Sequence, residues 1–193
     1  MKRRDFLTNS ALLGATAIMP AAVTSCSNNN NKGAEKKLSN EELGMFSFVN
    51  IAPDGDPLKA ALIGCGDRGT GAASQFLESG PNVSIVALAD LFSDRMDTCR
   101  KILADKFNNT VEDGRCFLGF EAYKKILELP DIDVVLLCTP THFRPEHFKA
   151  AVEAGKHIFM EKPCAVDPVG IRTVIAASKV ATSKGLTVIT GNQ

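Results

Sequence analysis

A glycine turn that directly follows an apolar strand constrains this chain more than any other feature. The run Leu58–Ile63 has strand character, and a helix-like segment follows it after a short turn. The turn contains three glycines spaced as G-x-G-x-x-G, namely Gly64, Gly66 and Gly69. In a dinucleotide site such glycines permit a tight bend, let the backbone approach a pyrophosphate, and let helix and strand pack closely. Glycine triplets also occur in ordinary turns, so the rest of the chain decides whether this turn binds a nucleotide.

Strand-like and helix-like segments alternate from Leu58 onward. Further strands are predicted at residues 83–89, 116–118, 132–138, 157–160 and 186–190, and helices at 70–78, 93–107, 120–129, 145–154 and 168–183. Helices of about 10–15 residues between strands imply parallel pairing through right-handed crossovers. We therefore expect an α/β fold, a doubly wound and mostly parallel Rossmann sheet of about six strands, formed by residues 57–193.

Three charged residues near the turn are candidates for contact with a nucleotide. Asp90 ends the second strand, 21 residues beyond Gly69, where a carboxylate accepts hydrogen bonds from the adenosine ribose hydroxyls. Such a carboxylate would repel a 2′-phosphate and favours NAD over NADP; the alternative is an ordinary loop carboxylate. Asp67 and Arg68 lie inside the turn, and Arg68 could approach the pyrophosphate or remain a solvated loop residue.

Two polar segments follow the fourth and fifth major strands, Thr139-Pro140-Thr141-His142 and Glu161-Lys162-Pro163. Ligands of open α/β sheets bind beyond the carboxyl ends of the strands, so both segments should share an edge with the glycine turn. Lys162 could donate to a substrate hydroxyl or help move its proton during hydride transfer, and Glu161 could hold that lysine in place. Lysines are mostly exposed, so the alternative is a surface lysine beside a proline.

Together these segments resemble the Gfo/Idh/MocA family of oxidoreductases over residues 58–193. The resemblance is carried, in order and spacing, by residues 64–69, 139–142, 154–157 and 161–163. It implies the family's N-terminal NAD-binding domain, with Lys162 matching the catalytic lysine. It also implies that Thr139, Pro140 and His142 lie near the cofactor. Glu161 and Asn192 are implied to lie beside the nicotinamide region.

The sequence departs from the family pattern at one loop residue and in its length. Arg144 stands where many relatives carry a histidine, and His147 is expected on a helix flank with no assigned role. The family's C-terminal domain, which supplies most substrate contacts, has no counterpart in these 193 residues. We therefore expect this chain alone to bind NAD without turnover, and the full-length protein to form a homo-oligomer.

Composition excludes two other classes of function. Lys plus Arg and Asp plus Glu number 22 each, so there is no basic field to recruit nucleic acid. The six cysteines form no C-x-x-C pair and no cluster with histidine, which argues against a zinc site. We therefore expect neither a nucleic-acid partner nor a bound metal.

The N-terminus has the features of an export signal. Residues 1–26 join a basic start to a short apolar run, shorter than the roughly 20 residues that span a bilayer. Arg3 and Arg4 resemble a twin-arginine signal, and the segment ending at Cys26 resembles a lipobox in which that cysteine is lipidated. We expect an exported, periplasmic, membrane-anchored lipoprotein with residues 27–56 as a polar tether; the alternative is a generic secretory signal.

Three functions fit these features. The first is the nucleotide-binding domain of an NAD-dependent oxidoreductase that acts on a sugar, a polyol or a related carbohydrate. The second is an NAD-dependent glycosidase, which oxidises the sugar transiently and returns the hydride. Export favours this second function, because a retained and regenerated cofactor needs no external NAD. The third is a non-catalytic nucleotide-binding lipoprotein or a gene fragment.

Overall fold

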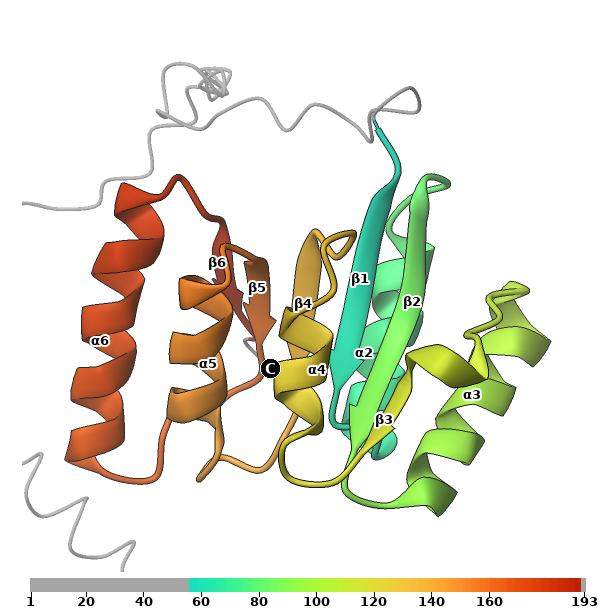
Figure 1. Cartoon of the computed structure of the whole chain (residues 1–193), viewed down its shortest axis with the longest axis horizontal. Coiled ribbons are helices and arrows are strands. Elements are labelled where there is room, and N and C mark those ends of the chain that lie inside the picture. The colour runs from blue at the N-terminus through green and yellow to red at the C-terminus, as the bar shows by residue number, and fades with distance from the viewer. Residues whose placement is uncertain (1–55, 192–193) are drawn as a thin grey trace, which may run out of the picture. The chain divides into compact units, whose positions relative to one another are not determined.

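Six parallel strands form one sheet in the computed structural model, which describes residues 56–191 (Figure 1). The strands lie in the order β3-β2-β1-β4-β5-β6. Their bounds are β1 (Leu58–Ile63), β2 (Val83–Asp90), β3 (Cys116–Leu118), β4 (Val134–Leu137), β5 (His157–Met160) and β6 (Val188–Thr190). The order reverses between β1 and β4, and this is the arrangement of a doubly wound Rossmann sheet. The predicted fold class is confirmed.

Helices cover both faces of this sheet. They are α2 (Asp67–Glu78), α3 (Ser93–Phe107), α4 (Ala122–Leu127), α5 (Arg144–Glu153) and α6 (Pro168–Ser183), with a short 3-10 turn, η1 (Asp113–Arg115). The helices α4, α5 and α6 pack on one face, and α2 and α3 pack on the other (Figure 1). Among residues 56–191, no helix has the length and apolar content needed to span a bilayer.

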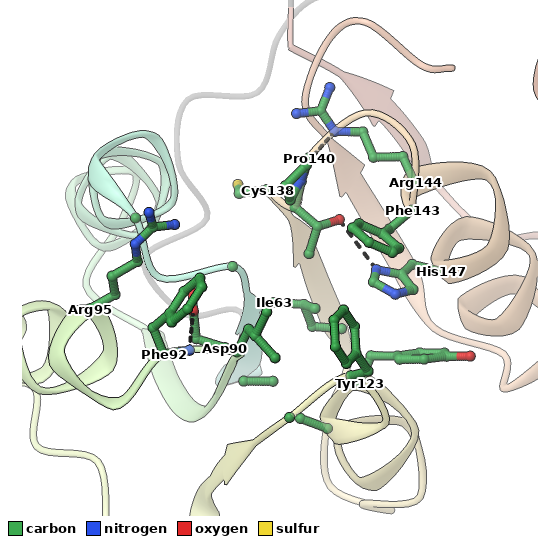
Figure 2. Close-up of a pocket in the computed structure, with 18 residues that line it drawn as sticks. Ile63, Asp90, Phe92, Arg95, Tyr123, Cys138, Pro140, Phe143, Arg144 and His147 are labelled. Carbon is green, nitrogen blue, oxygen red and sulfur yellow. Dashed lines mark hydrogen bonds between the residues drawn. The ribbon is translucent and has the colours of Figure 1, made fainter. Parts of the chain in front are cut away.

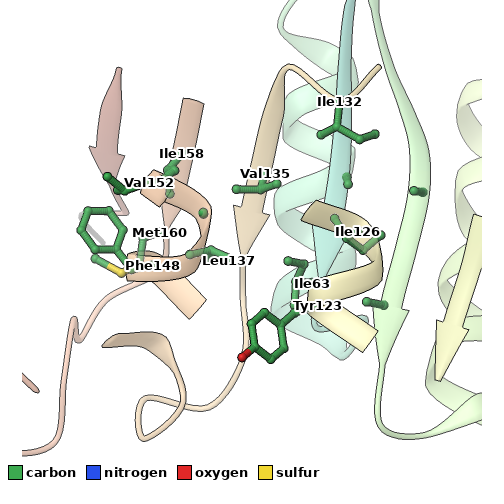
Figure 3. Packing of buried hydrophobic residues seen from close by; sticks show 14 of the residues in the cluster. Ile63, Tyr123, Ile126, Ile132, Val135, Leu137, Phe148, Val152, Ile158 and Met160 are labelled. Carbon is green, nitrogen blue, oxygen red and sulfur yellow. The ribbon is translucent and has the colours of Figure 1, made fainter. Parts of the chain in front are cut away.

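The core is split into two layers by the alternation of side chains along the strands. In β1, Ala61 and Ile63 point to the α4–α5–α6 side, whereas Ala60 and Leu62 point to the α2–α3 side. Figure 3 shows the first layer, in which side chains of α4 and α5 pack against β1, β4 and β5. Both faces of β1 are therefore buried, as its uninterrupted apolar sequence predicts.

Helix boundaries differ from the prediction where capping residues decide them. The helix α2 begins at Asp67, three residues early, because Gly66 serves as its N-cap. The helix α4 covers only Ala122–Leu127. It starts two residues late because Gly119, with a φ of 106°, forms a turn before it, and it ends at the C-cap Glu128. The predicted stop of α5 is confirmed, since Gly155 has a φ of 72°.

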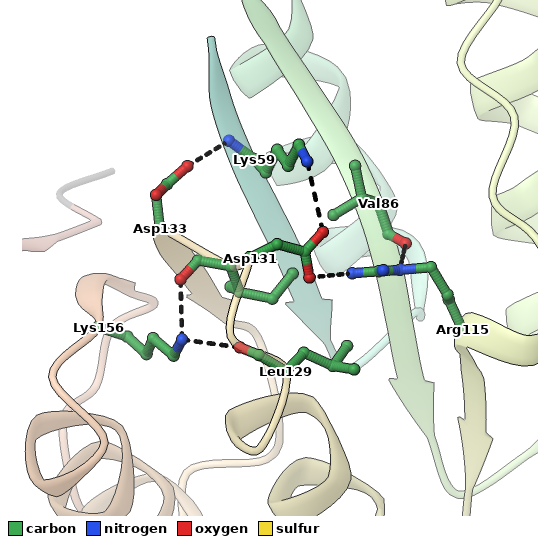
Figure 4. Close-up of polar contacts among 8 residues, drawn as sticks. Lys59, Val86, Arg115, Leu129, Asp131, Asp133 and Lys156 are labelled. Carbon is green, nitrogen blue, oxygen red and sulfur yellow. Dashed lines mark hydrogen bonds and ion pairs between the residues drawn. The ribbon is translucent and has the colours of Figure 1, made fainter. Parts of the chain in front are cut away.

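Polar contacts tie together the loops at the amino ends of the strands (Figure 4). The buried Lys156 amine donates to the carbonyls of Leu129 and Ile132, at 2.9 Å each. Arg115 pairs with Asp131 at 2.8 Å, and the same carboxylate accepts from Lys59 at 3.4 Å. The amino ends of the strands are therefore covered by side chains that bond to one another or to nearby carbonyls. The glycine turn lies at the opposite, carboxyl ends of the strands.

The predictions for the N-terminal signal, Cys26, the tether and Asn192 concern positions before residue 56 or after residue 191. They lie outside the described residues.

Candidate functional site

Two of the three motif glycines are required by packing inside the turn. Gly64 has a φ of 99°, and a Cβ added to it would lie 2.8 Å from the Cys138 carbonyl carbon. A Cβ on Gly69 would lie 1.7 Å from the Gly64 carbonyl oxygen, which no side chain can tolerate. The turn thus presses β1, β4 and α2 together, and this explains the first and last glycines of the motif.

Gly66 has a different environment, because its surface is open. A Cβ there would meet a single neighbour within 4 Å, the Arg95 Nη1 atom at 3.9 Å. Gly66 is also the N-cap of α2, and its carbonyl accepts from Thr70 N at 2.8 Å. No side chain caps the first turn of α2, which therefore begins beside an unobstructed backbone. Such a helix start attracts anions.

Asp90 is held against the same turn. One carboxylate oxygen accepts from Cys65 N at 2.6 Å, and the other accepts from Phe92 N at 2.9 Å. A carboxylate offers about four lone-pair sites, so acceptor capacity remains on its free side. These bonds fix the Asp90 side chain at the carboxyl end of β2, next to the glycine turn.

A cavity of about 310 Å³ lies between the ends of β1, β2 and β4 (Figure 2). Predicted residues that line it are Gly64, Gly66, Asp90, Thr139 and Pro140. The other lining side chains include four that the sequence did not single out as site residues, Phe92, Arg95, Tyr123 and Phe143. This size and this mixture of apolar walls with a few polar groups are typical of a site for a small molecule or cofactor.

Arg95 and Phe92 line the side of the cavity that lies beyond the carboxyl end of β2. The Arg95 guanidinium lies 4.9 Å from the Phe92 ring centroid, and both side chains are exposed. Arg95 forms no ion pair among residues 56–191, and its Nη1 atom is the one atom within 4 Å of a Cβ added to Gly66. The only sequence signal for this placement is its position in the first turn of α3, five residues after Asp90.

His147 lies in the opposite wall. It is buried, its Nδ1 atom lies 3.2 Å from Thr139 Oγ1, and its ring centroid lies 4.2 Å from that of Tyr123. Burial lowers the pKa of His147 to about 4, so the imidazole is neutral near pH 7. The sequence carries one indication that His147 is buried, namely its helical spacing: His147 and Ala151 share the inward face of α5 with Phe148.

Arg68 and Glu161 join the glycine turn to the end of β5. Glu161 is 2% exposed, and its Oε1 atom accepts from Arg68 Nε at 2.7 Å and also from Arg68 Nη2. This hydrogen bonding raises the pKa of Arg68. A Cβ on Gly191 would lie 2.8 Å from the same carboxylate oxygen. Glu161 thus holds Arg68, not Lys162, which differs from the role that the sequence predicts for it.

Other predicted residues lie beside the cavity rather than in its wall. Asp67 is exposed in the first turn of α2, and Lys162 is exposed just beyond β5. His142 is also exposed, and it lines a separate hollow together with Pro145 and Asp167. The structure therefore brings the glycine turn, Asp90 and the Thr139–Pro140 segment together, and it places His142 outside their cavity.

Comparison with known protein families agrees with this geometry. The model of an oxidoreductase family with an NAD-binding Rossmann fold matches residues 58–191. The chain belongs to the Gfo/Idh/MocA oxidoreductase family. Residues 58–191 are the family's NAD-binding domain, and the resemblance deduced from the motifs is confirmed.

The proteins and structures that this chain matches are longer than the chain itself. A glycosyl hydrolase family 109 protein of Streptomyces coelicolor is 27% identical over 169 residues, 86% of this chain and 35% of that protein. Glycosyl hydrolase family 109 protein 1 of Bacteroides fragilis is 36% identical over 115 residues, 59% of this chain and 24% of that protein. The structure of myo-inositol 2-dehydrogenase from Lactobacillus plantarum, 25% identical, matches with a TM-score of 0.56 over 70% of this chain and 36% of that chain.

Proposed function

We propose that this domain holds NAD along the carboxyl edge of its sheet, for an oxidoreductase that acts on a sugar, a polyol or a related carbohydrate. The observation that carries the proposal is the open surface of Gly66, between the start of α2 and the Arg95 guanidinium. A pyrophosphate needs close approach to the backbone and positive potential, and this surface offers both. Gly66 also lines the cavity that Asp90 and Thr139 line.

The residues around this surface fit NAD in named roles. Asp90 would accept the adenosine ribose hydroxyls, and Arg95 would neutralise the phosphates. Thr139 and Pro140 would contact the cofactor farther along the cavity, on the side of the nicotinamide. When bound, NAD supplies hydride transfer. Arg68, which is tied to Glu161, would hold the glycine turn and the end of β5 at a fixed separation.

Lys162 would act on the substrate. Its side chain is exposed beyond β5 and forms no ion pair among residues 56–191, so the amine is available to a hydroxyl or carbonyl. There it would donate a hydrogen bond or move the hydroxyl proton as the hydride leaves. Most substrate contacts would come from parts of the full-length protein beyond this domain.

The test is substrate-dependent reduction of NAD by the full-length protein with a panel of polyols and sugars. Lys162→Met should lower kcat by about 10²- to 10⁴-fold, because a positioned acid–base group contributes that much. Lys179→Met, at an exposed position of α6, is the matched control and should keep the wild-type rate. NAD affinity should change little in either variant. Equal activity of both variants would remove Lys162 from the reaction.

A glycosidase is the second candidate, favoured by the relatives that are named glycosyl hydrolases. In this function the hydride removed from the sugar returns to it within the same catalytic cycle. The full-length protein, purified without added NAD, would be given aryl glycosides. Release of the aglycone without net NADH would support the glycosidase, and NADH accumulation with free polyols would support the dehydrogenase.

We further propose that the protein is exported and anchored through a lipid on Cys26, as residues 1–26 suggest. Cys26→Ala should move the protein from the membrane fraction to the soluble periplasmic fraction, because the lipid attachment point is lost. Replacing both Arg3 and Arg4 by lysine should retain the protein in the cytoplasm. Membrane association that survives Cys26→Ala would exclude the anchor.

The full-length protein is proposed to be a homo-oligomer, and sedimentation would measure its oligomeric state.

A further inference from the structure

Arg144 is a buried cation whose bonds all go to backbone carbonyls. It is 7% exposed in the first turn of α5, and burial lowers its pKa. Among residues 56–191 it forms no ion pair. Burying a charge costs free energy unless hydrogen bonds compensate. The acceptors of the Arg144 hydrogen bonds therefore indicate the role of this residue.

Those acceptors belong to two loops at the carboxyl edge of the sheet. Arg144 Nε donates to the Thr139 carbonyl at 2.7 Å, and Arg144 Nη1 donates to the Pro163 carbonyl at 2.6 Å. Thr139 and Arg144 itself both line the cavity, and Pro163 directly follows Lys162. Figure 2 shows the Arg144 side chain beside the Thr139–Pro140 segment of the cavity wall. Through its second bond, to Pro163, the same side chain reaches the loop that carries Lys162.

Thr139 is held a second time by the same helix. His147, one turn farther along α5, lies 3.2 Å from the Thr139 hydroxyl oxygen. The Thr139 segment thus has an anchor that does not depend on Arg144. Among residues 56–191, Pro163 accepts one hydrogen bond from α5, and its donor is Arg144. Loss of Arg144 should therefore free the loop on its Pro163 side, while Thr139 stays in place and the Arg68–Glu161 pair still holds the end of β5.

We propose that Arg144 is a positioning residue that sets the location of Lys162 relative to the cofactor cavity; this inference rests on the proposed function of Lys162. The planar guanidinium presents several donors in a fixed fork, so it can hold two carbonyls at one separation. A lysine ammonium is a compact point charge without this fork. A histidine, which the family resemblance predicts here, has a shorter side chain and two ring nitrogens.

The experiment compares Arg144→Met and Arg144→Lys with Arg172→Met, an exposed arginine of α6. In the full-length enzyme, Arg144→Met should lower kcat by about 100-fold, because a 1 Å misplacement of a reacting group costs that much. The dissociation constant for NAD should rise by a smaller factor than kcat falls, since Arg144 is only one of the cavity's lining residues and Thr139 keeps its second anchor. Arg144→Lys should fall between Arg144→Met and wild type, and Arg172→Met should match wild type.

Hydrogen–deuterium exchange supplies a readout that does not depend on activity. Arg144→Met should speed exchange of the peptide containing Lys162 and Cys164 while peptides of β1 and β4 stay unchanged. Added guanidinium ion should restore part of the kcat of Arg144→Ala, because it replaces the missing fork. A loss of stability alone would produce faster exchange throughout and no rescue.

Two failures can be distinguished. If the wild-type enzyme transfers no hydride, the proposed function fails, and the exchange data still decide whether Arg144 holds the loop. If Arg144→Met exchanges like Arg172→Met at Lys162 and keeps its kcat, the inference is overturned. Should Arg144→Met not fold, Arg144→Lys decides, because wild-type kcat and wild-type loop exchange in that variant would also overturn it.

Discussion

At the residue scale, His147 shows how burial sets the chemistry of the cavity wall. Its ring packs against Tyr123, and its neighbours leave the imidazole little access to water, so its pKa falls to about 4. In the unfolded chain a histidine titrates near pH 6.5. At neutral pH the folded residue is therefore an uncharged hydrogen-bonding partner of Thr139 and contributes no charge to a bound cofactor.

This pKa difference predicts a loss of stability in mild acid. Between about pH 6.5 and pH 4 the unfolded state binds a proton that the folded state does not, so stability falls as the pH falls. From pH 7.5 to pH 5 the free energy of unfolding should drop by about 2 kcal/mol through His147 alone. Urea denaturation at both pH values measures this drop, which should be absent in His147→Gln. The exposed His142→Gln variant is the control and should keep it; an unchanged drop in His147→Gln would contradict the prediction.

At the element scale, the amino and carboxyl ends of the strands are built differently; these two sides of the sheet are called its amino edge and its carboxyl edge. The amino edge is closed by Lys156, Arg115, Asp131 and Lys59, whose donors and acceptors satisfy one another or nearby carbonyls. The carboxyl edge contains the glycine turn, Asp90 and the loops after β4 and β5, and it leaves a cavity open. The same parallel topology thus produces a structural edge and a binding edge.

The closed edge predicts a stabilising role for Lys156. Lys156→Met would leave the Leu129 and Ile132 carbonyls without their donor, and a buried unsatisfied polar group costs about 1–3 kcal/mol. We expect the free energy of unfolding to fall by about 2–4 kcal/mol, with NAD binding kept at temperatures where the variant is folded. Urea unfolding of Lys156→Met and of the exposed Lys179→Met provides the comparison. Equal stability of the two variants would show that the Lys156 bonds contribute nothing net.

Much of the fold could be predicted because its signals are local. Apolar runs predict β1 and β2, and Gly155 predicts the end of α5, from neighbouring residues alone. The spacing from Gly64 to Asp90 is set by the strand–helix–strand topology. The roles of Arg144 and His147 could not be predicted in this way. Their partners are brought to them by packing, since Pro163 lies 19 residues from Arg144 and Tyr123 belongs to another helix. Glu161 likewise contacts Arg68, 93 residues away, instead of its neighbour Lys162.

At the scale of the whole molecule, the described residues form the family's NAD-binding domain, and the chain spans 24% to 36% of the length of the three proteins compared with it. Cofactor binding can be measured on this chain, because the glycine turn, Asp90 and the cavity all lie within residues 56–191. Substrate choice belongs to experiments on the full-length protein.

The most direct test of the NAD site is calorimetric titration of this chain with NAD and NADP, using two glycine variants. Gly66→Val should weaken NAD binding by more than about tenfold, or ~1.4 kcal/mol, because its side chain occupies the surface proposed for the pyrophosphate. Gly71→Ala, whose Cβ meets nothing within 4 Å, should bind NAD like wild type. Wild type should prefer NAD to NADP because of the Asp90 carboxylate. Equal NAD affinity in wild type and Gly66→Val would contradict the proposed site.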